Sequence, residues 1–161
     1  MGDLAKITVR LAQEYEGEIL SDLSMRSKQS NGYDDAFMDA CRDELAVTPE
    51  RLQADEYWVA DADGICGCAS LSVDHDKKTG VVHSFFVEPE LRGSGIGKLL
   101  WHKLHERAQA HNLEALVLDS DPNAVEFYKS IGFVKVKDTP SGSIVGRFIP
   151  HMKLDLKDFS V

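Results

Sequence analysis

The chain has 161 residues, of which 43% are hydrophobic and 28% are charged, the balance of an ordinary soluble protein with one core. Its formal net charge of −9 argues against general nucleic-acid binding, because the phosphate backbone attracts basic surfaces. No apolar run is long enough to cross a bilayer, and the start MGDLAKITVR lacks the pattern of a signal peptide. We therefore expect one cytoplasmic domain over residues 1–161 that binds neither nucleic acid nor membrane.

The first half of the chain contains both strand and helix patterns. The segment KITVRLA alternates and predicts a strand. Apolar residues at helical spacing from Ala12 to Leu23 predict a helix that SKQSNGYDD ends, and those from Phe37 to Leu45 predict a second helix. The segment YWVADADGICGCASLSV predicts two strands joined at 61–64, and VVHSFFV predicts another strand after the turn KKTG.

The second half predicts two further helices and three strands. An apolar face from Ile96 to Ala108 marks one helix. The segment EALVLDS reads as a buried strand, and DPNAVEFYKSIGF reads as a helix that Asp121 caps and Gly132 ends. The strands FVKVKD and PHMKLDL close the chain around the loop TPSGSIVG. The order β-α-α-β-β-β-α-β-α-β-β implies a mixed sheet with helices packed on it.

The cysteines and histidines do not suggest a metal site. Cys41, Cys66 and Cys68 fit neither a disulfide framework nor a usual zinc site. Alternation along a strand would put Cys66 and Cys68 on one face, where we expect them to pack. His102 and His105 lie at i and i+3 of a helix, but the further ligands that a metal needs are absent from the pattern. We therefore expect no bound metal.

Three glycines, at 93, 95 and 97, precede a helix in the stretch RGSGIGK. A Walker A loop does not fit, because Arg92 occupies its first glycine position and Leu99 its Ser/Thr position. A dinucleotide fingerprint requires G-x-G-x-x-G, whereas this stretch has G-x-G-x-G. A general anion site does fit, since amides at a helix N-terminus bind phosphate and Arg92 and Lys98 add positive charge. A tight turn that uses glycine only for its shape is the alternative.

Two motifs resemble one family. The pattern Arg92-x-x-Gly95-x-Gly97, after the strand SFFV, is similar to the acetyl-coenzyme A motif of the GNAT N-acetyltransferase superfamily. The segment NAVEFYKSIGF, residues 123–133, is similar to the second motif of that family. The resemblance covers nearly the whole chain and implies one N-acetyltransferase-like domain over residues 1–161. The implied fold is α/β, with a mixed, mostly antiparallel, V-splayed sheet of about seven strands and helices on both faces.

The resemblance also implies how acetyl-coenzyme A, the acyl donor, would bind. Its pantetheine arm would lie in the cleft of the V and bond like an extra strand to the main chain of Phe85, Phe86 and Val87. Asn123, one turn before Tyr128, would face the same arm from the side of Tyr128 and hold it through its amide. The pyrophosphate would lie on the amides of the loop formed by Arg92, Gly93, Ser94, Gly95, Ile96, Gly97 and Lys98.

Direct transfer to an amine needs a base and an acid. An amine with a pKa of ~10.4 is mostly protonated at neutral pH and must lose a proton before it attacks. The candidate bases are His83, Glu88 or a relayed water, and alternation puts His83 on the strand face of Phe85 and Val87; a packed or solvated histidine is the alternative. Tyr128 lies on a core-facing helical stripe. The resemblance implies that its hydroxyl lies at the coenzyme sulfur and protonates the leaving thiolate, while a plain core aromatic is the alternative.

The resemblance implies that two segments form the acceptor side, because acceptor specificity in this superfamily lies largely in the corresponding regions. They are Met25–Met38 and Thr139–Pro150, and ordinary connections are the alternative for each. Their polar candidates for substrate binding are Lys28, Tyr33, Ser141, Ser143 and Arg147. Lys28 and Arg147 would suit an acceptor with a carboxylate, whereas the net charge favours a cationic one, and the sequence leaves both open.

The sequence therefore predicts an N-acetyltransferase that moves an acetyl group from acetyl-coenzyme A to a primary amine of a small-molecule or peptide acceptor. A non-catalytic acyl-coenzyme A sensor is one alternative, and an acyltransferase for a longer acyl group is another. Members of the family are often dimers, so the resemblance also allows a homodimer.

Overall fold

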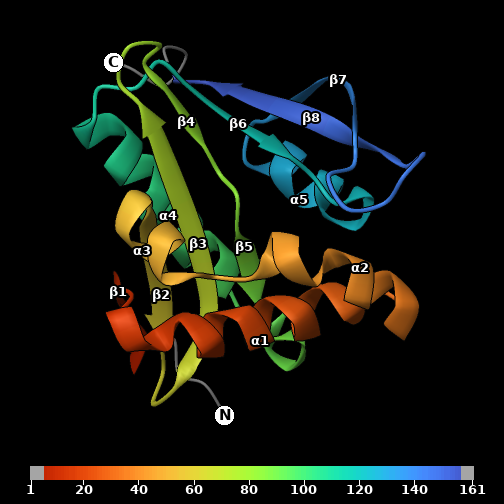
Figure 1. Cartoon of the computed structure of the whole chain (residues 1–161). Coiled ribbons are helices and arrows are strands. Elements are labelled where there is room, and N and C mark those ends of the chain that lie inside the picture. Colours follow the sequence, from red (N-terminus) through yellow and green to blue (C-terminus); the bar gives the residue numbers. More distant parts are fainter. Residues whose placement is uncertain (1–5, 157–161) are drawn as a thin grey trace.

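A computed structural model describes residues 6–156, which form an eight-stranded mixed sheet with helices on both faces (Figure 1). The strands are β1 (Thr8–Leu11), β2 (Glu56–Asp61), β3 (Ile65–Asp74), β4 (Thr79–Val81), β5 (Phe85–Val87), β6 (Ala115–Asp119), β7 (Val134–Pro140) and β8 (Phe148–Asp155). The helices are α1 (Gly17–Gln29), α2 (Asp35–Leu45), α3 (Pro49–Ala54), α4 (Ile96–Ala110) and α5 (Val125–Ser130). The short 3-10 turns are η2 (Glu14–Glu16), η3 (Pro89–Leu91) and η4 (Pro122–Ala124).

The strand order is β1-β2-β3-β4-β6-β8-β7, with β5 also paired to β3. Only β4 and β6 run parallel, and every other pair is antiparallel. This arrangement confirms the predicted class of fold. None of the helices within residues 6–156 has the length and apolar character that a membrane crossing requires.

The sheet splits where β3 changes its partner. Residues Gly67–Ala69 of β3 pair with β5, and residues Ser72–Asp74 pair with β4. β4 pairs with β6 on its other edge, whereas β5, within the described chain, pairs with β3 alone. One long edge of β5 therefore faces the gap between the two halves, as the V-shaped sheet requires.

The prediction of one continuous strand VVHSFFV is wrong, because residues 82–84, between β4 and β5, are not part of a strand. The Val82 amide still donates to the Val117 carbonyl at 3.0 Å, but the Ser84 carbonyl accepts from the Ser70 amide at 2.9 Å. The chain thus moves from one half of the sheet to the other within three residues. His83 lies at this crossing and not within a strand, so alternation does not set its direction.

Two apolar clusters cover the two faces of the sheet. Leu100 and Leu104 of α4 pack in one cluster with residues of β6 and β8. Leu20 and Leu23 of α1 pack in the other with Val59 of β2. All five side chains are fully buried, and each such burial stabilises the fold by roughly 1.5–3 kcal/mol. The clusters fix α1 and α4 on opposite faces of the sheet (Figure 1).

Cys66 and Cys68 lie on opposite faces, which corrects the expectation from alternation. Ala60 pairs with Gly67 and Asp61 pairs with Ile65, so Cys66 is an extra residue without a partner in the register. Such a β-bulge shifts the alternation by one residue. Cys66 packs in the α4 cluster and Cys68 in the α1 cluster.

Candidate active site

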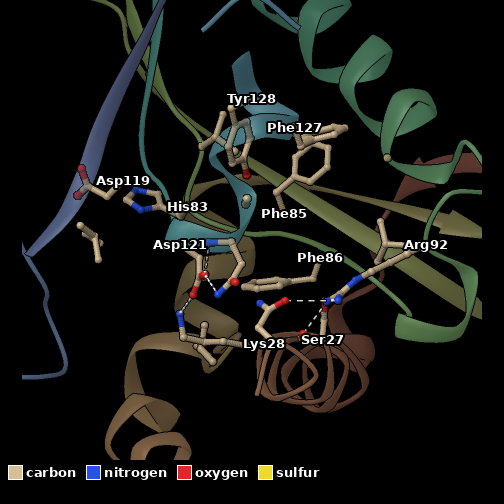
Figure 2. A pocket seen from close by; sticks show the side chains of 18 of the residues that line it. Ser27, Lys28, His83, Phe85, Phe86, Arg92, Asp119, Asp121, Phe127 and Tyr128 are labelled. Carbon is tan, nitrogen blue, oxygen red and sulfur yellow. Dashed lines mark hydrogen bonds and ion pairs between the residues drawn. The ribbon is translucent and has the colours of Figure 1, made fainter. Parts of the chain in front are cut away.

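A cleft of about 640 Å³ lies at the split in the sheet (Figure 2). Four parts of the chain line it: β5, the glycine loop at residues 92–98, the beginning of α5 with η4, and the end of α1. Arg147, from the loop between β7 and β8, also lines the cleft, as do Val82 and His83. Segments that are far apart in the sequence therefore meet at the place where the two halves of the sheet separate.

The residues expected to bind a pantetheine arm form one wall. Phe85, Phe86 and Val87 all line the cleft, and their strand has one unpaired edge within residues 6–156. The Phe85 ring centroid lies 5.4 Å from that of Phe127 and 6.0 Å from that of Tyr128. An extended ligand with amide groups can bond to this edge as a further strand would, beside an aromatic surface.

The glycine loop presents free amides at the start of α4. Gly93 and Gly95 have φ angles of 83° and 93°, a left-handed conformation that side chains other than glycine rarely adopt. The first amide bonded along the helix is that of Leu99, which donates to the Gly95 carbonyl at 3.1 Å. The amides of residues 96–98 precede this ladder and carry the positive end of the helix dipole. This is the arrangement that binds a phosphate group.

Gly97 does not have the left-handed conformation of Gly93 and Gly95. It lies inside the first turn of α4, and a β-carbon there would lie 3.4 Å from the Phe127 ring. The side chains of Ser94 and Ile96 do not line the cleft: Ser94 Oγ donates to the Leu91 carbonyl, and Ile96 is buried in the core. The Ser94 amide also donates to the Leu91 carbonyl, at 3.2 Å, so of these two residues only Ile96 has a main-chain amide to offer a ligand.

Arg92 lines the cleft but its charge is engaged. Its Nη2 donates to the Ser27 carbonyl at 2.6 Å and to Ser27 Oγ at 3.1 Å, and its Nη1 donates to Asn31 Oδ1 at 3.4 Å. A cation at the C-terminal end of α1 complements the helix dipole. Arg92 thus ties the glycine loop to α1, and the exposed Lys98 is the freer positive charge of the loop.

Tyr128 combines burial with a hydroxyl that faces the cleft. The side chain is 7% exposed and lines the cleft, and Figure 2 shows it reaching down from α5. Within residues 6–156 its hydroxyl makes no hydrogen bond, yet it is not sealed from solvent. Burial, together with the negative charge of Asp121, raises the pKa of the Tyr128 phenol. The group therefore stays protonated at neutral pH and is available as a proton donor.

Asp121 collects three of the side chains expected on the acceptor side. Its Oδ2 accepts from Lys28 Nζ at 3.1 Å and from the Tyr33 hydroxyl at 2.9 Å, and Arg147 Nη2 donates to that hydroxyl at 2.8 Å. Its Oδ1 accepts from the amide and from Nδ2 of Asn123, both at 2.9 Å. Burial opposes the ionisation of Asp121, but these hydrogen bonds and the charge of Lys28 lower its pKa. The carboxylate is therefore ionised and saturated with donors.

The sequence identified Asp121 only as a helix cap. It does cap η4, since the amide bonded to its Oδ1 is that of Asn123. Its second oxygen reaches α1 and the segment after it, which no local pattern indicates. Asn123 lines the cleft, but its amide nitrogen is bonded to Asp121 and, at 3.3 Å, to Tyr33. Its carbonyl oxygen is the atom left for a ligand.

Ser141 and Ser143 are not brought to the cleft. Ser141 Oγ accepts from the amides of Ser143 and Ile144 at 3.3 and 3.2 Å, which shapes the loop between β7 and β8. Ser143 Oγ donates to the Glu44 carboxylate of α2. These serines hold the loop against α2 instead of facing a ligand.

The two candidate bases lie in different surroundings. His83 is exposed and lines the cleft. Glu88 does not line it, and its carboxylate accepts from Arg26 Nε and Nη2 at 3.0 and 2.9 Å. His83 is therefore the better placed of the two. In residues 6–156 no group of three His, Cys, Asp or Glu side chains is arranged to hold a metal ion.

Comparisons with known proteins agree with this geometry. Residues 12–156 match the family model described as an acetyltransferase (GNAT) domain. The peptidyl-lysine N-acetyltransferase YjaB of Salmonella typhimurium is 31% identical over 151 residues, which cover 92% of this chain and 97% of that protein.

Solved structures share the fold. A GCN5-related N-acetyltransferase from Rhodopseudomonas palustris superposes with a TM-score of 0.78 at 21% identity, covering 97% of this chain and 98% of that one. The PaiA N-acetyltransferase of Thermoplasma acidophilum, solved in complex with coenzyme A, superposes with a TM-score of 0.75 at 18% identity, covering 92% and 98%.

Proposed function

The chain belongs to the GNAT acetyltransferase family and is an N-acyltransferase, and we propose that it transfers the acetyl group of acetyl-coenzyme A directly to a primary amine. The proposal treats residues 1–161 as one acetyltransferase domain. The observation that carries it is the unbonded Tyr128 hydroxyl, which opens into the same cleft as the free amides of the glycine loop. YjaB is named for transfer to peptidyl-lysine, which supports a lysine-like amine as the acceptor.

The residues of the cleft fit acetyl-coenzyme A. The amides of Gly93 and of residues 95–98 would bind its pyrophosphate, and Lys98 would add a positive charge. The free edge of β5 would bond to the pantetheine arm, and the Phe85 and Phe127 rings would cover its carbon chain. When bound, acetyl-coenzyme A supplies the activated acetyl group, and the protein supplies position and proton transfer.

The chemistry requires two protons to leave the acceptor ammonium and one to reach the sulfur. His83 would accept the first proton of the acceptor ammonium, directly or through a water. The neutral nitrogen would then form a bond to the acetyl carbon as the carbon–sulfur bond breaks. Tyr128 would donate its hydroxyl proton to the departing sulfur. The second proton of the amine nitrogen would leave to solvent, which would restore the proton of Tyr128.

A thiol-release assay tests the proposal. Wild-type protein is incubated with acetyl-coenzyme A and a panel of primary amines, and free coenzyme A and the mass of the acetylated product are measured. We expect turnover with at least one amine and little with a longer acyl-coenzyme A. Tight calorimetric binding of acetyl-coenzyme A without turnover on any amine would instead show a sensor, and preference for a longer acyl group would show a different donor.

A further inference from the structure

The acceptor end of the cleft contains cations with unused hydrogen-bond donors. Lys28 and Arg147 both line the cleft, with side chains 15% and 20% exposed. The Lys28 ammonium has three donors, and within residues 6–156 one of them bonds to Asp121, at 3.1 Å. Arg147 has five donors, and within residues 6–156 it bonds only to the Tyr33 hydroxyl, through Nη2. The described residues include no buried side-chain nitrogen or oxygen that lacks a partner, so these remaining donors are open to the cleft, where a ligand with acceptor atoms can bind them.

The Arg147 guanidinium is also held in one orientation. Its central carbon lies 4.9 Å from the Phe37 ring centroid and 5.3 Å from the Tyr33 ring centroid. Those two rings are stacked on each other, 4.1 Å apart and tilted by 9°. The guanidinium therefore lies beside the stacked pair, where these contacts and the bond to the Tyr33 hydroxyl limit its rotation. The fork of donors on a guanidinium matches the two oxygens of a carboxylate.

The carboxylates that line the cleft do not occupy the remaining donors of the two cations. Asp121 is saturated by Lys28, Tyr33 and Asn123, and it lies 3.8 Å from Arg147 Nη2. Glu44 and Asp119 also line the cleft, but Glu44 accepts from Ser143 and Asp119 pairs with His151 Nδ1 at 2.7 Å. Asp121 instead acts to hold the cations in place.

We propose that Lys28 and Arg147 form an anchor for a carboxylate on the acceptor molecule, so that the preferred acceptor is an amine that carries a carboxylate. This inference rests on the proposed function and names the class of its acceptor. A carboxylate suits the anchor better than a phosphate, because the ionised Asp121 beside it repels a dianion more strongly than a monoanion. The chemistry is that of an amino acid or of a peptide with a free carboxylate near its amine.

Matched pairs of ligands test the anchor without changing the protein. One pair is Nα-acetyl-lysine and its amide, and a second is a series of ω-amino acids of increasing length with alkylamines of equal length. Each is assayed by thiol release and by calorimetry on protein saturated with coenzyme A. We expect kcat/KM and affinity to be roughly 10- to 100-fold higher for the carboxylate member, as hydrogen bonds to charged groups imply.

Variants locate the effect. In Arg147→Gln and in Lys28→Gln we expect the ratio of kcat/KM for the carboxylate member to kcat/KM for the neutral member to fall toward one. The change should come mainly from a higher KM for the carboxylate. Arg42→Gln is the matched control, because it removes a cation that is 63% exposed and bonded to Asp39 on α2. It should keep the wild-type ratio. A general loss of structure would lower kcat/KM for both members of a pair and leave the ratio of the two values unchanged.

The outcomes separate this inference from the proposed function. Equal acetylation of both members by the wild type would overturn the anchor and leave the acetyltransferase intact. If no amine is acetylated, the proposed function fails, and calorimetry still decides the anchor, because equal or absent binding of the two members overturns it. Stronger binding of an aminoalkyl phosphate of matched length would show that the anchor selects phosphate.

Discussion

Gly93 and Gly146 adopt nearly the same left-handed backbone conformation, with φ angles of 83° and 82°. A β-carbon added at either position would meet no heavy atom of the described protein within 4 Å, apart from neighbours in the chain. The two residues differ in location, because Gly93 belongs to the loop before α4 and Gly146 to the loop between β7 and β8. An L-residue in this conformation costs about 1–2 kcal/mol at either place.

This relationship gives a matched test of the phosphate site. Gly93→Ala and Gly146→Ala should lower the free energy of unfolding by a similar amount, about 1–2 kcal/mol. Only Gly93→Ala should weaken the binding of coenzyme A, by roughly tenfold, because its methyl group would disturb amide bonds to the pyrophosphate. Denaturation and calorimetry measure the two effects. Equal affinities for coenzyme A in the two variants would contradict a phosphate site at this loop.

The class of fold could be predicted because its signals are local. Alternation, helical spacing and two short motifs each act over a few residues, and they indicated most of the elements that the structure contains. Two expectations failed where pairing with a distant strand decides the result. Residues 82–84 leave the ladder because β3 changes partner, and the bulge at Cys66 exists only relative to Ala60 and Asp61.

The parts of the candidate site that lie in contiguous motifs could be predicted from the sequence, and the parts that depend on distant contacts could not. The glycine loop and Tyr128 belong to contiguous motifs, and their roles stay predictions for the assays described here. The sequence indicates Asp121 only as a cap, because its bonds to Lys28 and Tyr33 join positions that are 93 and 88 residues apart. A polar residue two positions after the end of the buried strand β6 is the one signal present.

His83 and Glu88 can be separated by mutation. His83→Ala should lower turnover roughly 100-fold or more, as loss of a general base does, and added imidazole should restore part of it. Glu88→Gln should leave turnover unchanged, since that carboxylate is bonded to Arg26 outside the cleft. Thiol release measures both. Wild-type turnover in His83→Ala would remove the histidine from the mechanism.

Glu56 should make stability depend on pH. Burial opposes its ionisation, but hydrogen bonds from Arg107, His111 and Trp58 lower its pKa from 4.5 to about 2. A lowered carboxyl pKa stabilises the fold above pH ~4.5, and this contribution is lost as the pH falls toward about 2. Glu56→Gln should therefore reduce stability at pH 7 by about 1–3 kcal/mol and flatten the pH dependence in that window.

Chemical denaturation across pH measures this effect. Glu106→Gln is the control, because its side chain is 67% exposed and pairs only with Lys103 on α4. It should change stability by less than about 0.5 kcal/mol. An equal pH dependence in Glu56→Gln and the wild type would show that Glu56 does not contribute in this way.

Gly17 should resist a substitution that normally helps helices. Glycine to alanine inside a helix usually stabilises by about 0.5–1 kcal/mol. At Gly17 the new β-carbon would lie 2.6 Å from the Val47 carbonyl oxygen, so the backbone must move, and we expect Gly17→Ala to destabilise by about 1–3 kcal/mol. Gly97→Ala meets an ordinary contact of 3.4 Å with Phe127 and should not destabilise. Thermal denaturation without ligand would refute this account if both variants gained stability.

Tyr128→Phe tests the proposed acid most directly. The substitution keeps the ring, whose centroid lies 5.4 Å from Phe127 and 5.6 Å from Phe133, and removes a hydroxyl that bonds to no described residue. Folding and coenzyme A affinity should therefore barely change, while turnover falls roughly 10- to 1000-fold. Tyr57→Phe is the control, because it removes the hydroxyl of another buried tyrosine, bonded to Ser84, and should leave turnover unchanged. Because burial raises the pKa of Tyr128, the fall in turnover in Tyr128→Phe should be similar across the whole neutral pH range. Wild-type turnover in Tyr128→Phe would mean that water or another group protonates the sulfur.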